Sequence, residues 1–102
     1  MALPYVEQPG RHVADITLYA LSTCPYCRAT KEYLNQHGIE YKYIDIDTLP
    51  LEEAEEAEQV VEEYNPHDTF PTLVVNGGHQ VIVGYQPNAL EELISRSHFK
   101  RS

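Results

Sequence analysis

Two cysteines three positions apart are the residues of this chain best suited to chemistry. Cys24 and Cys27 are its two cysteines, and the loop they would close is too short to constrain the unfolded chain much. A stabilising disulfide is therefore a poor explanation for the pair, and reversible thiol–disulfide exchange is a better one. In that chemistry Cys24 attacks a substrate disulfide, and Cys27 resolves the mixed disulfide that forms.

The expected secondary structure around the pair favours a thiolate at Cys24. The β-favouring run 16–20 predicts a buried strand, and Pro25 suits the first turn of a following helix over 25–37. We therefore expect Cys24 at a helix N-terminus, where free N–H groups and a partial positive charge stabilise a thiolate. Cys27 follows nearly one turn later and faces back beneath it.

A cysteine pair of this spacing is also half of a zinc site. The chain has no second cysteine pair, so a shared metal ion would require two chains. Its histidines, which form no recognisable ligand spacing, are His12, His37, His67, His79 and His98. We expect no metal site, and the redox interpretation is favoured because this pair enters the helix of a strand–helix–strand unit.

Further strands and helices must position the pair. The remaining expected elements are a strand at 40–47, a helix at about 50–64, strands at 72–75 and 80–83, and a helix after an N-cap at Asn88. The expected inward-facing residues of the two helices are Leu51, Ala54, Ala57, Val61 and Tyr64, then Leu90, Leu93 and Ile94.

The order β-α-β-α-β-β-α predicts the architecture. A strand–helix–strand unit normally joins two parallel strands, and Asn76-Gly77-Gly78 is a strong hairpin signal. We therefore expect an α/β protein with the thioredoxin fold, built on a four-stranded mixed sheet with helices on both faces. The folded domain is expected at 15–98, between an N-terminal tail at 1–14 and a C-terminal tail at 99–102.

Composition excludes several classes of protein. The net charge of −9 argues against nucleic-acid binding, which needs clustered Lys and Arg. No apolar run approaches the roughly 20 residues of a membrane span, and the N-terminus lacks the pattern of a secretory signal. We expect a cytoplasmic monomer. Much of the negative charge lies in the stretch 52–63, which is either a solvated helix face or a surface that steers a basic partner.

The run Thr69-Phe70-Pro71-Thr72 stands directly before an expected buried strand. Pro71 there is either a simple strand initiator or a cis proline packed against the dithiol. Only about 5% of X-Pro bonds are cis, so the residues alone favour the strand initiator.

Three motifs together resemble the glutaredoxin family over roughly residues 15–97. They are Cys24-Pro25-Tyr26-Cys27, Thr69-Phe70-Pro71-Thr72 and Val83-Gly84-Tyr85. The resemblance implies a thioredoxin fold, Cys24 as nucleophile, Cys27 as resolving thiol and Pro71 as a cis proline. It also implies protein or glutathione mixed disulfides as substrates, with glutathione as co-substrate and no tightly bound cofactor.

The residues expected to bind substrate lie in the same three motifs. The expected set is Pro25, Tyr26, Phe70, Pro71, Gly84 and Tyr85. Phe70 is expected to contribute backbone contacts to a glutathionyl or peptide segment. Tyr26 is expected to be exposed and to shape the cleft, and Tyr85 either lines that cleft or covers the end of the sheet.

The chain departs from many glutaredoxins where glutathione is held. Leu21 stands where the family often has Lys, and Gln86-Pro87-Asn88 replaces a polar cap. The Gly-aromatic-x-Pro pattern is similar to redoxins that support ribonucleotide reductase and take electrons from thioredoxin reductase. Arg28 and Lys31 are either replacement anchors for an anion or plain exposed charges. The electron source is therefore left as glutathione or thioredoxin reductase.

One alternative belongs to another functional class. Some glutaredoxins carry an iron–sulfur cluster between two chains, each contributing its first cysteine, which is Cys24 here. This function is less common where proline follows that cysteine.

Overall fold

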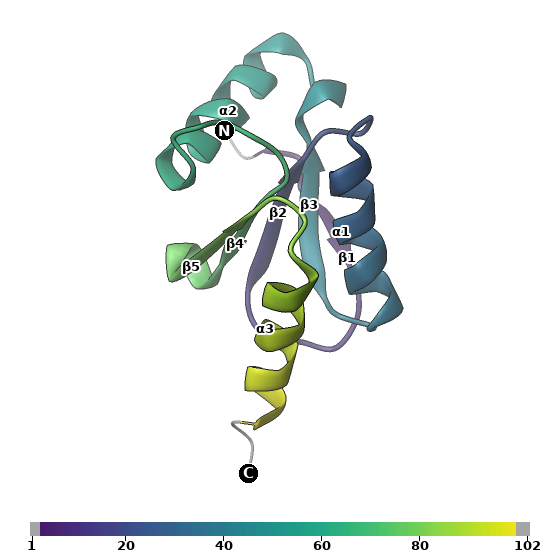
Figure 1. Ribbon diagram of the computed structural model, residues 1–102. Helices are drawn as coiled ribbons and strands as arrows, with labels where there is room; N and C mark the ends of the chain where they lie inside the picture. The colour runs from purple at the N-terminus through teal and green to yellow at the C-terminus, as the bar shows by residue number, and fades with distance from the viewer. Residues whose placement is uncertain (1–2, 100–102) are drawn as a thin grey trace.

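The strands and helices follow the predicted order, with one strand added near the N-terminus. The structure, a computed structural model, describes residues 3–99, without the side chains of residues 96–99. Its elements are β1 (Val6–Gln8), β2 (Ile16–Ala20), α1 (Pro25–Gln36), β3 (Tyr41–Asp45), the 3-10 turn η1 (Ile46–Thr48), α2 (Leu51–Tyr64), β4 (Thr72–Val75), the 3-10 turn η2 (Asn76–Gly78), β5 (Gln80–Val83) and α3 (Pro87–Phe99) (Figure 1). Of the C-terminal tail expected at 99–102, residues 100–102 lie outside the described residues.

The sheet has five strands in the order β1-β3-β2-β4-β5, so the prediction of four strands is wrong. The pair β2 and β3 is parallel, and the other three pairs are antiparallel. The added strand, β1, has only three residues and lies between two prolines in the segment expected to be a tail. The sequence gives no sign of this strand, because apolar and polar residues do not alternate between a buried and an exposed face. The neighbouring residues Val6 and Glu7 are both exposed.

Contacts beyond the strand pairing also hold this N-terminal segment. The hydroxyl groups of Tyr5 and Tyr19 lie 2.9 Å apart, and their rings pack edge to face. The backbone N–H of Arg11 donates to the carbonyl of Gly38 at 2.7 Å, next to an isolated bridge between Arg11 and Ile39. The segment is therefore joined both to β2 and to the turn before β3.

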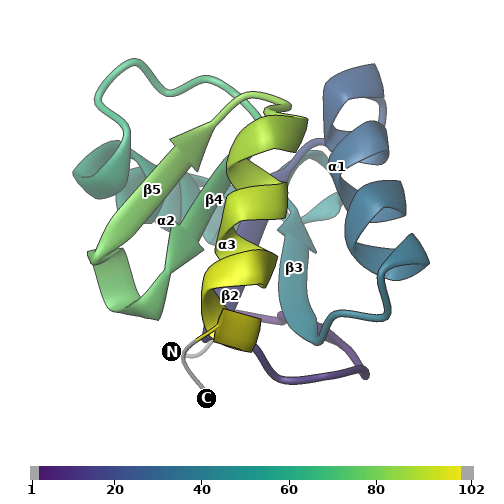
Figure 2. The ribbon, with the colours of Figure 1, turned by 60° about the horizontal axis from the view of Figure 1, so that its bottom comes forward.

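Helices cover both faces of the sheet, as the sequence predicts. Figures 1 and 2 show α1 and α3 on one face and α2 on the other. Leu34 of α1 and Leu90 of α3 are buried against the first face, together with Leu18 of β2. Ala57 and Val61 of α2 are buried against the opposite face. The sheet therefore lies between two hydrophobic clusters, as expected for an α/β layered domain.

Three predicted details need correction. The third strand was expected to reach residue 47, but it ends at Asp45, and η1 bends the chain toward α2. The last helix begins at Pro87, so Asn88 lies inside its first turn and is not its N-cap; proline suits that first position because its missing N–H would be unpaired anyway. Leu51 was expected to face inward but is 73% exposed, because it occupies the first position of α2, ahead of the part that packs on the sheet.

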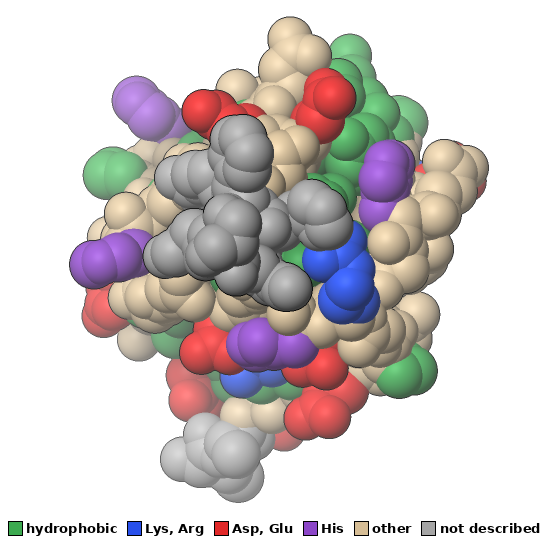
Figure 3. Space-filling view, turned by 90° about the horizontal axis from the view of Figure 1, so that it is seen from below, with side chains coloured by type: hydrophobic (Ala, Val, Ile, Leu, Met, Phe, Trp, Pro, Cys, Tyr) green, Lys and Arg blue, Asp and Glu red, His purple; other side chains and the backbone are tan. Residues whose placement is uncertain are grey.

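The end of the molecule opposite the start of α1 carries scattered charges. Figure 3 shows Asp and Glu side chains spread over this end, with few Lys and Arg among the side chains drawn in colour. This face therefore has no basic patch of the kind that binds nucleic acid, as far as the described side chains show. No helix in the range 3–99 is long and apolar enough to cross a membrane.

Candidate active site at the Cys24–Cys27 dithiol

Cys24 caps the N-terminus of α1 with its own side chain. Its Sγ accepts a hydrogen bond from the backbone N–H of Cys27 at 3.4 Å, and its carbonyl accepts from the N–H of Arg28 at 3.0 Å. Pro25 occupies the first helical position, where it needs no donor. The sulfur of Cys24 therefore lies among the unpaired N–H groups that begin the helix, as predicted.

This environment lowers the pKa of Cys24. Partial burial raises the pKa, but hydrogen bonds from the Cys27 thiol and from the backbone N–H groups of Cys27 and Tyr26 outweigh that effect. All three donors stabilise the charged form of the sulfur. Cys24 is half-buried, so it combines a favoured thiolate with access for a substrate.

Cys27 lies in the opposite environment. It is 1% exposed and belongs to the core cluster on the α1 face of the sheet. Burial raises the pKa of Cys27 to about 12, although the backbone N–H of Leu21, which donates to its Sγ at 3.5 Å, and the charge of Lys31 act in the other direction. Cys27 is therefore a protonated thiol at neutral pH, directly beneath the reactive one.

The segment that precedes β4 lies at the same end of the sheet. The Phe70–Pro71 peptide bond is cis, which agrees with the expectation from the family resemblance. Tyr19 pairs with Thr72 in the antiparallel register, and continuing that register sets Pro71 across from Ala20 at the end of β2. Phe70 is half-buried and packs against both core clusters.

A buried asparagine, Asn65, which sequence reasoning missed, holds this segment. It is 3% exposed, and its amide donates to the carbonyl and hydroxyl of Thr69 and to the hydroxyl of Thr72, all at 3.0 to 3.1 Å. Its Oδ1 accepts from the backbone N–H of His67. The Asn-Pro pair at 65–66 predicts a helix end, but nothing in the sequence indicates that the side chain turns inward.

The third motif joins the same region. The N–H of Gly84 donates to the carbonyl of Pro71 at 2.8 Å, and its φ of +83° is a backbone conformation that glycine adopts without strain. Tyr85 is half-buried against the cluster that also contains Cys27. Tyr26 is 64% exposed, as predicted. Strand register and hydrogen bonds thus bring Pro71 and Gly84 together, beside the end of β2 that leads to the cysteines.

Lys31, considered as a replacement anchor for an anion, is already paired. Its Nζ lies 2.9 Å from Oδ1 of Asp45 and 4.1 Å from the centroid of the Tyr43 ring. Both side chains of this ion pair are about one-fifth exposed. Arg28 is exposed on the same helix. Asp45 was not among the predicted site residues, because its pairing with Lys31 depends on which strands are neighbours and where β3 ends.

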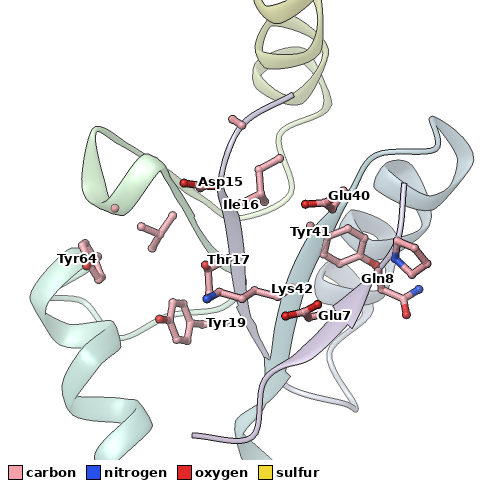
Figure 4. A pocket seen from close by; sticks show the side chains of 14 residues that line it. Glu7, Gln8, Asp15, Ile16, Thr17, Tyr19, Glu40, Tyr41, Lys42 and Tyr64 are labelled. Carbon is pink, nitrogen blue, oxygen red and sulfur yellow. The ribbon is translucent and has the colours of Figure 1, made fainter. Parts of the chain in front are cut away.

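A groove of about 700 Å³ lies elsewhere, around the start of β2. The two cysteines lie beyond the opposite end of that strand. Figure 4 shows Asp15, Thr17 and Tyr19 of this region beside Lys42 and Glu7. The groove is lined by acidic, aromatic and amide side chains and contains neither cysteine. Within residues 3–99 no group of three or more His, Cys, Asp or Glu side chains is placed to hold a metal. The dithiol is therefore the better candidate for the active site.

Comparison with known proteins gives one consistent result. Residues 16–80 match the glutaredoxin family. The Gene 56 protein of Mycobacterium phage L5 is 31% identical over 94 residues, which cover 88% of this chain and 85% of that protein. The crystal structure of the glutaredoxin from Methanosarcina mazei Go1 superposes with a TM-score of 0.79 and 31% identity, covering 88% of this chain and 86% of that one.

A more distant neighbour is described by its activity. The glutaredoxin-like NrdH-redoxin from Escherichia coli superposes with a TM-score of 0.57 and 25% identity, covering 78% of this chain and 93% of that one. Its structure is reported as the basis for a thioredoxin-like activity profile.

Proposed function

This chain belongs to the glutaredoxin family, and we propose that it is a dithiol oxidoreductase that reduces protein or glutathione mixed disulfides through Cys24 and Cys27. The observation that carries the proposal is the contrast between the two sulfurs. Cys24 has a lowered pKa at a half-exposed helix N-terminus, and Cys27 is protonated and buried beneath it. A nucleophile and a resolving thiol need these two environments.

The reaction follows in two exchanges. The Cys24 thiolate attacks one sulfur of the substrate disulfide, which forms a mixed disulfide and releases the other sulfur as a thiolate. Cys27 then loses its proton and attacks the Sγ of Cys24, which releases the second substrate thiol. The protein is left with a Cys24–Cys27 disulfide, and two electrons from an external dithiol or two thiols restore it. Every electron passes between sulfur atoms, so we propose that no bound organic cofactor takes part.

The binding of substrate is proposed to use the surface around Cys24. The backbone of Phe70, next to Pro71, is proposed to pair with an extended peptide or glutathionyl segment, as the family resemblance implies. Tyr26 offers an exposed aromatic face directly after Pro25, and Gly84 and Tyr85 border the segment from the other side. Exposed aromatic side chains beside a reactive group often serve recognition.

The electron source is a second question, and the local charges favour a protein donor. Glutathione is an anion, and Leu21 offers it no charge. Lys31 is occupied by Asp45, and Asp47 adds an exposed negative charge near the loop before Cys24. We therefore propose thioredoxin reductase as the donor, with glutathione as the alternative. The thioredoxin-like activity profile reported for the Escherichia coli neighbour supports this direction.

Two cysteine variants test the proposed function. Cys24→Ser should abolish reduction of insulin and of a glutathionylated peptide, because the nucleophile is gone. Cys27→Ser should still attack, accumulate mixed disulfides and keep only the monothiol route with glutathione. Reduction at an undiminished rate by the Cys24→Ser protein would overturn the assignment.

The oxidised protein tests the electron source directly. NADPH consumption is compared for thioredoxin reductase and for glutathione with glutathione reductase, at equal concentrations of oxidised protein. Turnover with thioredoxin reductase alone is the expected result. Rapid turnover with glutathione would instead mean that Leu21 and Gln86-Pro87-Asn88 are tolerated variations in a glutathione-dependent glutaredoxin.

A further inference from the structure

Ser22, two residues before Cys24, is held by a residue from another element. Oδ1 of Asp47, in η1, accepts a hydrogen bond from the backbone N–H of Ser22 at 2.8 Å. Oδ2 of the same carboxylate accepts a second bond from the Ser22 hydroxyl at 2.7 Å. Both oxygens of Asp47 are therefore committed to one residue of the loop that leads to the dithiol.

The parallel pairing of β2 and β3 explains why these two residues meet. Ala20 at the end of β2 lies opposite Asp45 at the end of β3. Both strands point the same way in Figure 1, so the chain leaves both at one edge of the sheet. Ser22 and Asp47 each lie two residues beyond that edge, which brings them face to face.

The residue next to Ser22 contacts both cysteines through its backbone. The N–H of Leu21 donates to Sγ of Cys27 at 3.5 Å. The carbonyl of Leu21 accepts from the N–H of Cys24 at 3.2 Å, which closes a turn over residues 21–24. The conformation of this turn therefore sets the position of Cys24 and supplies a donor to the sulfur of Cys27.

We propose that Asp47 is a positioning residue of the dithiol, which holds Ser22 and thereby keeps the turn 21–24 in the conformation that serves both cysteines. The inference rests on the proposed function, because it concerns the reactivity of the same two thiols. Asp47 acts through Ser22 and Leu21.

The charge of Asp47 and its geometry act on Cys24 in opposite directions. A negative charge close to a thiol disfavours the thiolate, so a purely electrostatic effect of Asp47 would raise the pKa of Cys24. A positioning effect lowers it, because the turn keeps Cys24 at the helix N-terminus. Hydrogen bonds from Ser22 also lower the pKa of Asp47 itself, so its carboxylate is ionised and able to accept both bonds at neutral pH.

The test measures the alkylation of Cys24 by iodoacetamide as a function of pH in the full chain. Asp47→Ala should move the midpoint of the profile upward and slow alkylation at neutral pH by roughly threefold to tenfold, because a shift of one pKa unit changes the thiolate fraction about tenfold. Asp47→Asn keeps an oxygen for the N–H of Ser22 and an amide for its hydroxyl, so it should stay at or below the wild-type midpoint. Ser22→Ala should shift the midpoint upward by less than Asp47→Ala.

Thr48→Val is the matched control. Thr48 lies in the same turn, and its hydroxyl donates to the carbonyl of Asp45 at 2.8 Å, so the variant disturbs η1 without removing a contact to Ser22. Its profile should match the wild type. The inference is overturned if Asp47→Ala and Ser22→Ala leave the midpoint unchanged or lower it, or if Thr48→Val shifts it equally. Should Asp47→Ala fail to fold, Ser22→Ala alone decides by the same criterion.

Alkylation needs no substrate and no electron donor. If the alkylation profiles contradict this inference, the Cys24→Ser test of the proposed function still stands. If that test fails, the alkylation profiles still report whether Asp47 positions the dithiol.

Discussion

The backbone N–H of Cys27 donates a hydrogen bond to the Sγ of Cys24 at 3.4 Å, so the two cysteines are linked before any disulfide forms. This contact helps to stabilise a charge on Cys24, whose pKa is lowered. Burial, and to a smaller extent the hydrogen bond and charge of Cys24, raise the pKa of Cys27 to about 12. The order of the two chemical steps follows from this asymmetry.

The first prediction concerns selective alkylation. Cys24 should react with iodoacetamide with a pH midpoint below that of a cysteine in the unfolded chain, because its folded pKa is lowered. Cys27 should stay unmodified at neutral pH and gain reactivity only in strongly alkaline solution, because its folded pKa is raised to about 12. Peptide mapping by mass spectrometry gives both profiles. The same chain in urea should label at both cysteines, and equal labelling of both in the folded state would contradict the asymmetry.

The second prediction concerns the charge of Lys31. Its ammonium lowers the pKa of Cys27, so Lys31→Met should slow the second exchange, while the initial attack by Cys24 stays unchanged. Because the charge of Lys31 is the smallest of the effects on the pKa of Cys27, we expect resolution to slow by about threefold or less, which corresponds to about half a pKa unit or less. Rapid quenching and mass spectrometry would follow the accumulated mixed disulfide. Lys42→Met is the control, because Lys42 is a lysine of β3 whose ammonium lies over the ring of Tyr5 and away from the dithiol.

Much of the fold was predictable because its signals are local. The strands at 16–20, 72–75 and 80–83 have the predicted bounds, since each is a short β-branched or apolar run bordered by turn residues. The additional strand, β1, was not predictable. It forms because β3 has a free edge and because long-range contacts, such as that between Tyr5 and Tyr19, hold the segment there. Its own three residues carry no periodicity.

The site shows the same division between local and long-range information. Cys24, Pro25 and Cys27 could be predicted because the strand-to-helix junction supplies the chemistry within a few residues. The ion pair of Lys31 with Asp45 and the contact of Ser22 with Asp47 depend on which strands are neighbours and in what register. Such pairs follow only from the folded topology.

The third prediction compares two leucines. Leu34 is fully buried between α1 and the sheet, so Leu34→Ala should lower the free energy of unfolding by about 3 kcal/mol through lost burial and a residual cavity. Leu51 is 73% exposed, so Leu51→Ala should change the free energy of unfolding by less than about 0.5 kcal/mol. Urea denaturation of both variants gives the comparison. A large loss for Leu51→Ala would contradict the exposed position of this side chain.

The last prediction concerns Asn65 and the loop that carries Phe70 and Pro71. Asn65→Ala removes the buried amide that bonds to Thr69 and Thr72, and the cost should be about 2 kcal/mol, since buried partners are left unpaired. Urea denaturation measures it, with Asn88→Ala, an exposed asparagine in the first turn of α3, as the control expected to stay near wild type.

Asn65→Asp separates the hydrogen bonds of this side chain from its volume. At neutral pH the variant sets a buried carboxylate against the carbonyl of Thr69, so it should be less stable than Asn65→Ala. Burial raises the pKa of such a carboxyl in the folded state, so stability relative to wild type should recover as the pH falls and the group becomes protonated. If the difference in unfolding free energy between Asn65→Asp and Asn65→Ala stayed constant from neutral to acidic pH, the side chain of Asn65 would fill space without donating to Thr69. The loop would then need another anchor.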